Sequence, residues 1–392
     1  MMKLSTDRIL TTHVGSLPRP ARLLPLLQAQ SAGKPFDAEE LIRETGVSVG
    51  DIVRCQIAAG IDVVSDGEYG KGSYTHYVRH RLSGIALVPV DDAPRAVVSL
   101  DDREFPDWAA ERNTRSVGSR IMPATCCIGP VTYTDKSPLE RDLANFDAAT
   151  AAAEPVEGFL NAASPGVLIN FIPNRHYARE DDYLDALANA MQVEYEAIVN
   201  AGFIVQIDAP DIAMTRSTRH ADKSEADFVK IVERNIDALN HATRNIAPEA
   251  MRLHLCWGNY AGPHKNDIEL GKIMNVVLKA RAQAISFEGA NPRHEHEWED
   301  WKEADIPDDK ILIPGVIDSA CNFVEHHRLI AQRIFNYTNI VGRERVIAGA
   351  DCGFGTFGRS SSVYESVVWA KFRALAEGAA LASQRLWGVA PR

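Results

Sequence analysis

The chain has 392 residues, of which 45% are hydrophobic and 24% charged, a composition typical of a globular protein with a large core. Its formal net charge of -11 excludes the basic footprint of a nucleic-acid-binding protein and gives no support for binding an acidic membrane surface. The six cysteines are too sparse for a disulfide scaffold, and no apolar run reaches the roughly 20 residues of a membrane-spanning helix. The first ten residues lack the apolar run of a signal peptide, so we expect a reducing, cytoplasmic location.

Short β-rich runs recur along the chain, and most end in a polar or glycine-containing turn. The candidate strands lie within residues 9–16, 61–68, 121–130, 167–173, 203–210, 252–259, 284–291, 311–318 and 345–353. Apolar residues at helical spacing predict helices over 183–200, 224–242 and 363–386. The second of these opens with a capping box, Ser224-x-x-Asp227.

The alternation of strands and helices predicts parallel strands, and eight such units close a TIM (β/α)8 barrel. Because nine runs qualify as strands, one of them is expected to lie outside the barrel. Segment 84–120 is rich in charges and prolines, and segment 134–180 is interrupted by proline and glycine, so both resemble insertions over the barrel face. The chain has no linker, long low-complexity tract or internal repeat, which favours a single domain over 1–392.

Polar residues concentrate at the carboxyl ends of the candidate strands. They are Gly15 and Ser16, Asp66 to Glu68, Asp208, His254 with Cys256, Glu288, and Asp351 with Cys352. In a TIM barrel the carboxyl ends of the strands form the active-site face, so we expect these side chains to meet at one mouth.

A metal site is predicted among them. His254 and Cys256 are two residues apart, so on a strand they point to the same face, and Glu288 and Cys352 end later strands. One imidazole, two thiolates and one carboxylate suit four-coordinate Zn²⁺. Their charge of -3 against +2 makes a poor activator of water but a good site for holding a thiol substrate as its thiolate. Buried core cysteines are the alternative at this point.

Several motifs resemble the catalytic barrel of cobalamin-independent methionine synthases. The motifs are TTHVGSLPRP, SDGEYGK, IGPVTY, QIDAPDI, HLCWGN, SFEGAN and GADCGFGT, and the resemblance spans about residues 9 to 387. It implies a catalytic zinc that activates homocysteine for methylation, bound by His254, Cys256, Glu288 and Cys352.

The same resemblance implies a substrate pocket. Gly15 and Ser16 would meet the substrate carboxylate through their main chain, and Glu68 and Asp208 would receive its ammonium as the acids of the catalytic site. Two acids at a barrel mouth would select a cationic amine. The alternative is that these acids cap helices.

The chain also departs from the long members of that family. It has one barrel rather than two, and Ala320 stands where the resemblance places a proton-donating histidine. His326 and His327 lie about two helical turns further along. The alkyl donor therefore stays open among a methyl-folate, a methyl-corrinoid and another electrophile.

A second branch is also similar. VIDSACNFVEHH and GADCGFGTFGR resemble epoxyalkane:coenzyme M transferases, in which a thiol opens an epoxide. A sulfonate thiol would need cations, for which the candidates, each more typical of a surface charge, are Arg19, Lys71, Arg79 and Arg175. A zinc-binding barrel with lyase or hydrolase activity, or with no catalytic role, is the alternative from another class. The expected partners are a small thiol and an alkyl donor, and a homo-oligomer stays open.

The run NPRHEHEWEDW, residues 291–301, combines histidines and acids directly after one candidate strand. Such a run of charges is typical of a solvated loop or of the start of a helix. A second metal site is the alternative.

Overall fold

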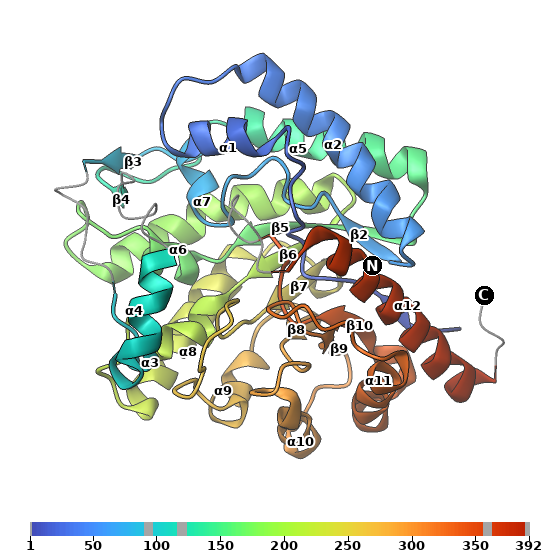
Figure 1. The fold of residues 1–392 in the computed structure, drawn as a ribbon. Helices are drawn as coiled ribbons and strands as arrows, with labels where there is room; N and C mark the ends of the chain where they lie inside the picture. Colours follow the sequence, from blue (N-terminus) through green and yellow to red (C-terminus); the bar gives the residue numbers. More distant parts are fainter. Residues whose placement is uncertain (1, 90–96, 116–123, 356–362, 389–392) are drawn as a thin grey trace.

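The barrel wall is one parallel sheet (Figure 1). The computed structural model describes residues 2–89, 97–115, 124–355 and 363–388. The order of the eight strands is β1 (Leu10–Thr11), β10 (Ile347–Ala350), β9 (Ile311–Ile317), β8 (Ala284–Phe287), β7 (Met251–His254), β6 (Ile204–Asp208), β5 (Glu157–Ala163) and β2 (Val63–Ser65). Asp62 N–H donates to the Thr11 carbonyl at 3.1 Å, so β2 also meets β1. The predicted TIM barrel is confirmed.

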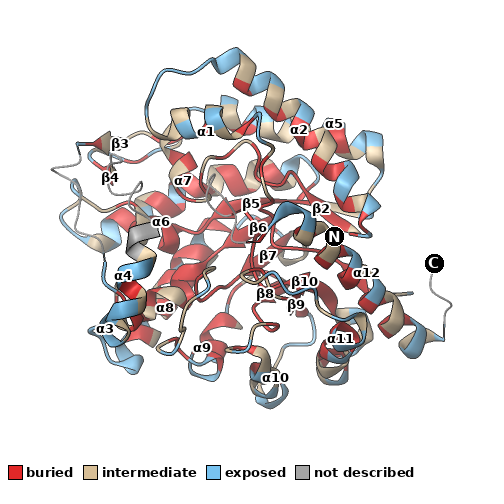
Figure 2. Ribbon diagram, in the orientation of Figure 1, coloured by how far each residue is buried: buried red, intermediate tan, exposed pale blue. Residues whose placement is uncertain are grey.

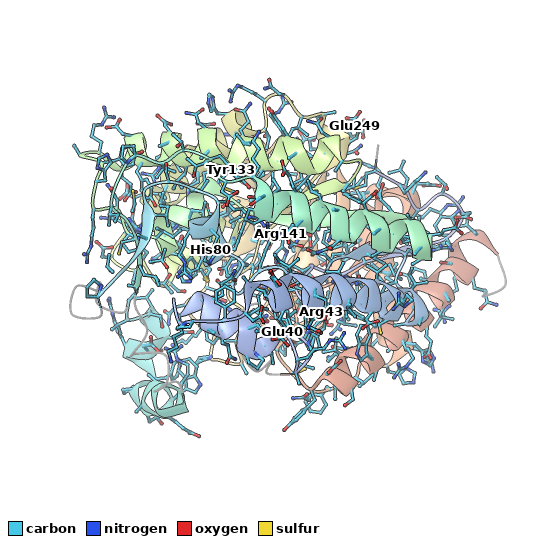
Figure 3. The ribbon with its side chains drawn as sticks, turned by 90° about the horizontal axis from the view of Figure 1, so that it is seen from above. Glu40, Arg43, His80, Tyr133, Arg141 and Glu249 are labelled. Atoms are coloured by element: carbon cyan, nitrogen blue, oxygen red, sulfur yellow. The ribbon has the colours of Figure 1, made fainter. Side chains whose placement is uncertain are left out.

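Helices surround this sheet. They include α2 (Ala38–Ala58), α5 (Ser137–Ala153), α7 (Glu180–Asn200), α8 (Glu225–Ala242), α9 (Leu270–Val277), α10 (Trp298–Glu303), α11 (His327–Val341) and α12 (Glu365–Trp387), with the shorter α1 (Leu24–Ser31) near the N-terminus. The three predicted helices correspond to α7, α8 and α12, and Ser224 caps α8 by accepting the Asp227 N–H. Seen from above, α2 with Glu40 and Arg43 runs alongside α5 with Arg141 (Figure 3).

The strand predicted over 167–173 is wrong, because α6 (Pro165–Phe171) begins there instead. The Ser164 Oγ accepts the Val167 N–H at 2.9 Å. Serine at the cap followed by proline at the first helical position is a helix-start signature. Because the residues after this signature are mostly apolar, the run resembles a buried strand, and the helix start was overlooked.

The strand β5 was not predicted, although it is part of the barrel wall. Gly158 and Asn161 interrupt its apolar pattern, and it lies in the segment 134–180 that we expected to be an insertion. That segment therefore contributes one barrel strand. Two of the nine candidates, rather than the expected one, therefore lie outside the barrel. The second is 121–130, whose described part forms β4 (Ala124–Cys127), antiparallel to β3 (Ile85–Val88) and separate from the barrel sheet.

The described part of segment 84–120 continues from β3 into α3 (Leu100–Glu104) and α4 (Pro106–Arg115). Leu100 N–H donates to the Ser217 carbonyl at 2.8 Å, and Asp101 accepts from the Asn266 side chain at 2.7 Å. These contacts attach α3 to the loops that follow β6 and β7. Residues 90–96 and 116–120 of this segment lie outside the described residues.

The barrel strands are almost entirely buried (Figure 2), and their inward side chains change from apolar to polar along the strands. Phe159 and Ile204 belong to a buried apolar cluster inside the barrel. Two residues further along the same strands stand Asn161 and Gln206, and then Asp208, all of them buried. Side chains two apart on a strand share a face, so this polar layer lies toward the carboxyl ends. In the described part of the chain, no helix combines the length and apolarity needed to cross a bilayer.

The cap of α6 supports a stability prediction. Ser164 Oγ also donates to buried Asp211 Oδ1 at 2.6 Å, whereas the Ser224 cap of α8 is exposed. Ser164→Ala is expected to lower the free energy of unfolding by about 2 to 3 kcal/mol, since it removes a cap and a partner of a buried carboxylate. Ser224→Ala should lower it by about 1 kcal/mol. Urea denaturation compares the two, and equal losses would contradict the assignment.

Candidate functional site

Three of the four predicted metal ligands converge at the barrel mouth. Candidate ligand atoms of His254, Cys256 and Cys352 all lie within 4.8 Å of one another, and all three residues are buried. His254 ends β7, Cys256 follows it by two residues, and Cys352 follows β10. The two sulfur atoms are 3.5 Å apart and the cysteines are free, so no disulfide joins them.

The chemistry of this cluster fits a soft divalent cation. Burial, assisted by Arg252, lowers the pKa of His254 to about 3, so the ring is neutral, as a metal ligand must be. Its Nδ1 lies 3.3 Å from Ser286 Oγ, and its buried Nε2 has no hydrogen-bond partner among the described residues. The hydrogen bond with Cys352, together with burial, raises the pKa of the Cys256 thiol well above its usual value. A cation between the sulfurs would reverse that effect.

Glu288, the fourth predicted ligand, lies beside the cluster but outside it. Its Oε1 accepts the Trp257 N–H at 2.8 Å, and its Oε2 accepts from the Asn291 amide at 2.7 Å. Burial, and next the proximity of Cys256, raises the pKa of Glu288 well above its usual value. The carboxylate is thus within electrostatic reach of the thiols while two N–H donors hold it.

Asp351 fixes the loop that carries Glu288. Its carboxylate accepts N–H groups from Gly289 at 2.8 Å, Ala290 at 2.8 Å and Asn291 at 2.9 Å. Since Asp351 immediately precedes Cys352, the ends of β8 and β10 are locked together at the cluster. Residues around a metal centre commonly orient its ligands in this way.

Segment 291–301 contains the start of helix α10 at Trp298, as one of the two expectations had it, but it is not wholly solvated. His294 is buried, its Nδ1 lies 3.0 Å from Glu297 Oε2, and its Nε2 lies 3.2 Å from Asp267 Oδ2. Burial alone would lower its pKa, but these two carboxylates raise the pKa of His294 to about 10. The imidazolium ring stacks on Trp257 with 4.2 Å between centroids. The segment therefore packs against Trp257, the residue next to Cys256. Among the described residues it does not form a second metal site, because the one group of candidate ligands is His254, Cys256 and Cys352.

Glu68 forms the edge of a second buried cluster. Its φ of +59° is in the left-handed region, a strained conformation for a side chain of this size that tends to persist at functional sites. Its Oε2 is buried without a hydrogen-bond partner among the described residues. Burial raises the pKa of Glu68, Lys71 opposes the shift, and Asp208 adds to it. The Arg19 guanidinium forms an ion pair with Glu68 Oε2 at 4.0 Å, which is too long for a hydrogen bond, so the oxygen still lacks an N–H donor.

Asp208 is held by two amides, one from the neighbouring strand β5 and one from its own strand β6. Asn161 Nδ2 donates to its Oδ2 at 2.9 Å, and Gln206 Nε2 donates to its Oδ1 at 2.7 Å. Burial raises the pKa of Asp208 in spite of these hydrogen bonds. Asp208 is also the direct partner of His254 in the register of β6 and β7. The acid cluster of Glu68 and Asp208 therefore adjoins the thiol cluster of Cys256 and Cys352. Sequence reasoning missed Asn161 because it missed β5.

The Gly15–Ser16 turn is also at this mouth. Gly15 has a φ of +122°, and a Cβ on it would lie 2.0 Å from Asn161 Oδ1, so only glycine fits. The Ser16 carbonyl accepts the Phe354 N–H at 2.8 Å, which joins the loops after β1 and β10. The structure therefore brings together all the residues predicted for the substrate pocket.

Two of the cations considered for a sulfonate are not surface charges. Arg19 and Lys71 are both buried. The Arg19 guanidinium donates to the carbonyl of Glu68 at 3.0 Å and of Lys71 at 2.8 Å, and Lys71 Nζ donates to the Asn161 carbonyl at 2.5 Å. Both cations thus fasten the loop after β2 to its surroundings.

Comparisons with known proteins identify the family. A family model described as the cobalamin-independent synthase catalytic domain matches residues 109–368. Methionine synthase from Saccharolobus solfataricus is 22% identical over 380 residues, covering 96% of this chain and 95% of that protein. Methionine synthase from Sulfolobus acidocaldarius is 24% identical over 272 residues, covering 69% and 68%.

A solved structure has the same fold. It is a B12-independent methionine synthase from Shewanella sp. W3-18-1 in complex with selenomethionine, with a TM-score of 0.73 and 20% sequence identity. The match covers 97% of this chain and 100% of that one. It supports the barrel assignment independently of the strand order.

The assignment of Cys352 as a metal ligand predicts that its loss lowers the affinity for zinc, whereas loss of Cys55 does not. Cys352→Ser is expected to weaken zinc binding by more than about 100-fold, beyond the effect of losing a residue that only supports a ligand. Cys55→Ser, at an exposed position on α2, should bind zinc as the wild type does. Competition with a chromophoric chelator measures both affinities. Equal affinities would refute the assignment.

The His294 ion network predicts a pH dependence of stability. Because the folded-state pKa is raised from 6.5 to about 10, the contribution is fully present below pH 6.5 and is lost as pH rises through about 10. The stability difference between wild type and His294→Gln should therefore shrink by up to about 1.4 kcal/mol per pH unit over that range. Denaturant unfolding from pH 6 to 9.5 measures it, with His296→Gln at an exposed position as the control. A constant difference would contradict the network.

Proposed function

The chain belongs to the cobalamin-independent methionine synthase catalytic-domain family, and from that premise we propose that it methylates the sulfur of homocysteine at a zinc centre. The observation that carries the proposal is the adjacency of two buried clusters. The thiol cluster of Cys256 and Cys352 lies beside the acid cluster of Glu68 and Asp208, because Asp208 is the register partner of His254. Neighbouring strands are about 4.8 Å apart, which is close to the sulfur-to-nitrogen span of homocysteine.

The donor set for the ion is His254, Cys256 and Cys352, with Glu288 as the fourth ligand. Zinc held there would supply a means of keeping the substrate sulfur deprotonated at neutral pH, since a free thiol has a pKa of about 8.5. Asp351 and Asn291 position Glu288, and the stacked His294 and Trp257 position Cys256. These contacts fix the ligands before a substrate arrives.

Glu68 and Asp208 bind the substrate ammonium in this proposal. Burial makes both carboxyl groups costly to ionise alone, so a cation that enters between them gains two charge-assisted hydrogen bonds. The Gly15–Ser16 turn lies against Asn161, and in this proposal its main chain meets the substrate carboxylate. The amino acid end is thereby held while the sulfur faces the thiol cluster.

In the methyl transfer, a sulfur–carbon bond forms as the bond between the methyl carbon and its donor breaks, and the thiol proton leaves. The donor is a methyl-folate or a methyl-corrinoid. Epoxide opening by coenzyme M is disfavoured, because its sulfonate would meet the carboxylates of Glu68 and Asp208. The buried cations nearby, Arg19 and Lys71, donate to main-chain carbonyls.

A cobalt-substituted protein tests the proposal. Homocysteine is expected to add a sulfur-to-cobalt charge-transfer band, with coenzyme M at least about 100-fold weaker, because a tenfold change in affinity is worth about 1.4 kcal/mol and a buried like-charge contact is worth several. Single-turnover mixtures with methyl-tetrahydrofolate or methylcobalamin should then yield methionine. A cobalt spectrum unchanged by every thiol would sink the proposal.

A further inference from the structure

We propose that Asn161 is a third acceptor for the amino group of the thiol substrate, beside Glu68 and Asp208, and that it sets the preference for thiols that carry an amine. The inference rests on the proposed function, because it takes the thiol as the substrate. Asn161 lies on β5 with 2% of its surface exposed.

The orientation of the Asn161 amide is fixed by its partners. Its Nδ2 donates to the Val14 carbonyl at 2.7 Å and to Asp208 Oδ2 at 2.9 Å. A main-chain carbonyl and an aspartate oxygen can only be satisfied by donors here, so the nitrogen must face them. The Asn161 Oδ1 therefore points elsewhere, and it has no hydrogen-bond partner in the described part of the chain.

Gln206 provides an internal comparison. It also donates to the Val14 carbonyl, at 2.5 Å, and to Asp208, at 2.7 Å. Its Oε1, however, accepts from Arg252 Nε at 2.6 Å. Two amides thus hold the same carboxylate, but only the Asn161 oxygen lacks a donor. Buried polar atoms are rarely left without a partner, so this oxygen indicates a ligand that brings an N–H group.

The oxygen lies where the substrate pocket is expected. A Cβ placed on Gly15 would be 2.0 Å from Asn161 Oδ1, so the two meet at the turn proposed to bind the substrate. Glu68 Oε2, which has Arg19 as an ion-pair partner at 4.0 Å, is the other buried oxygen of this cluster that lacks a hydrogen-bond donor among the described residues. An ammonium has three N–H donors, which match Glu68, Asp208 and Asn161. An alkyl group or an anionic head has none.

The test compares two thiols on the cobalt-loaded protein. Homocysteine carries the amine, and 4-mercaptobutyrate is the same thiol acid without it. Asn161→Leu is expected to weaken homocysteine binding by about 10- to 100-fold, the range for hydrogen bonds to a charged group, and to change 4-mercaptobutyrate binding by less than about 3-fold. Asn161→Ala provides the same comparison should the leucine variant not fold.

Asn235→Leu is the matched control, since Asn235 is another buried amide that donates to a buried acid, Asp211, at 2.9 Å. It should leave the ratio of the two affinities unchanged. Equal weakening of both thiols by Asn161→Leu would overturn the inference while leaving the proposed function intact. A wild-type protein that binds neither thiol would overturn the proposed function itself, and the inference with it.

A double-mutant cycle separates direct contact from support of Asp208. In an Asp208→Asn background, Asn161→Leu should still weaken homocysteine binding several-fold, because Oδ1 meets the ammonium on its own. If the effect of Asn161→Leu disappears in that background, Asn161 acts only through Asp208 and the proposed contact is wrong.

Discussion

The contact on which the site depends is the approach of two buried thiols, Cys256 and Cys352, to 3.5 Å beside a neutral imidazole. The hydrogen bond with Cys352, together with burial, raises the pKa of the Cys256 thiol, and a nearby cation would favour its thiolate. The loops around them serve this arrangement. Asp351, the residue before Cys352, accepts N–H groups from the loop that carries Glu288, and His294 stacks on Trp257, the residue after Cys256.

Burial also opposes ionisation in the neighbouring acid cluster of Glu68 and Asp208. Glu68 and Asp208 are buried and their pKa values are raised, while Arg19 and Lys71 donate to main-chain carbonyls and Arg19 forms only a 4.0 Å ion pair with Glu68. The barrel mouth therefore holds more groups that become anionic than groups that are cationic. A metal ion at one cluster and an ammonium at the other would balance both, which is why a thiol that is also an amine suits this mouth.

The sequence predicted the parts of the site that depend on strand periodicity. His254 and Cys256 share a face because they are two apart on a strand, and Asp208 and Cys352 follow well-patterned strands. Asn161 was missed because glycine and asparagine break the apolar pattern of β5, and the run 167–173 was wrong because a capped helix start preceded it. The burial of His294 was unpredictable locally, since its two carboxylate partners include Asp267, 27 residues away.

The central claim is that the thiol cluster holds zinc and receives a substrate sulfur. X-ray absorption spectroscopy of the zinc-loaded protein tests it most directly. The account predicts a first shell with two sulfurs at about 2.3 Å and at least one nitrogen at about 2.0 Å. On addition of homocysteine it predicts a third sulfur at the same distance. A shell of nitrogen and oxygen alone, or a sulfur count that homocysteine leaves unchanged, would contradict it.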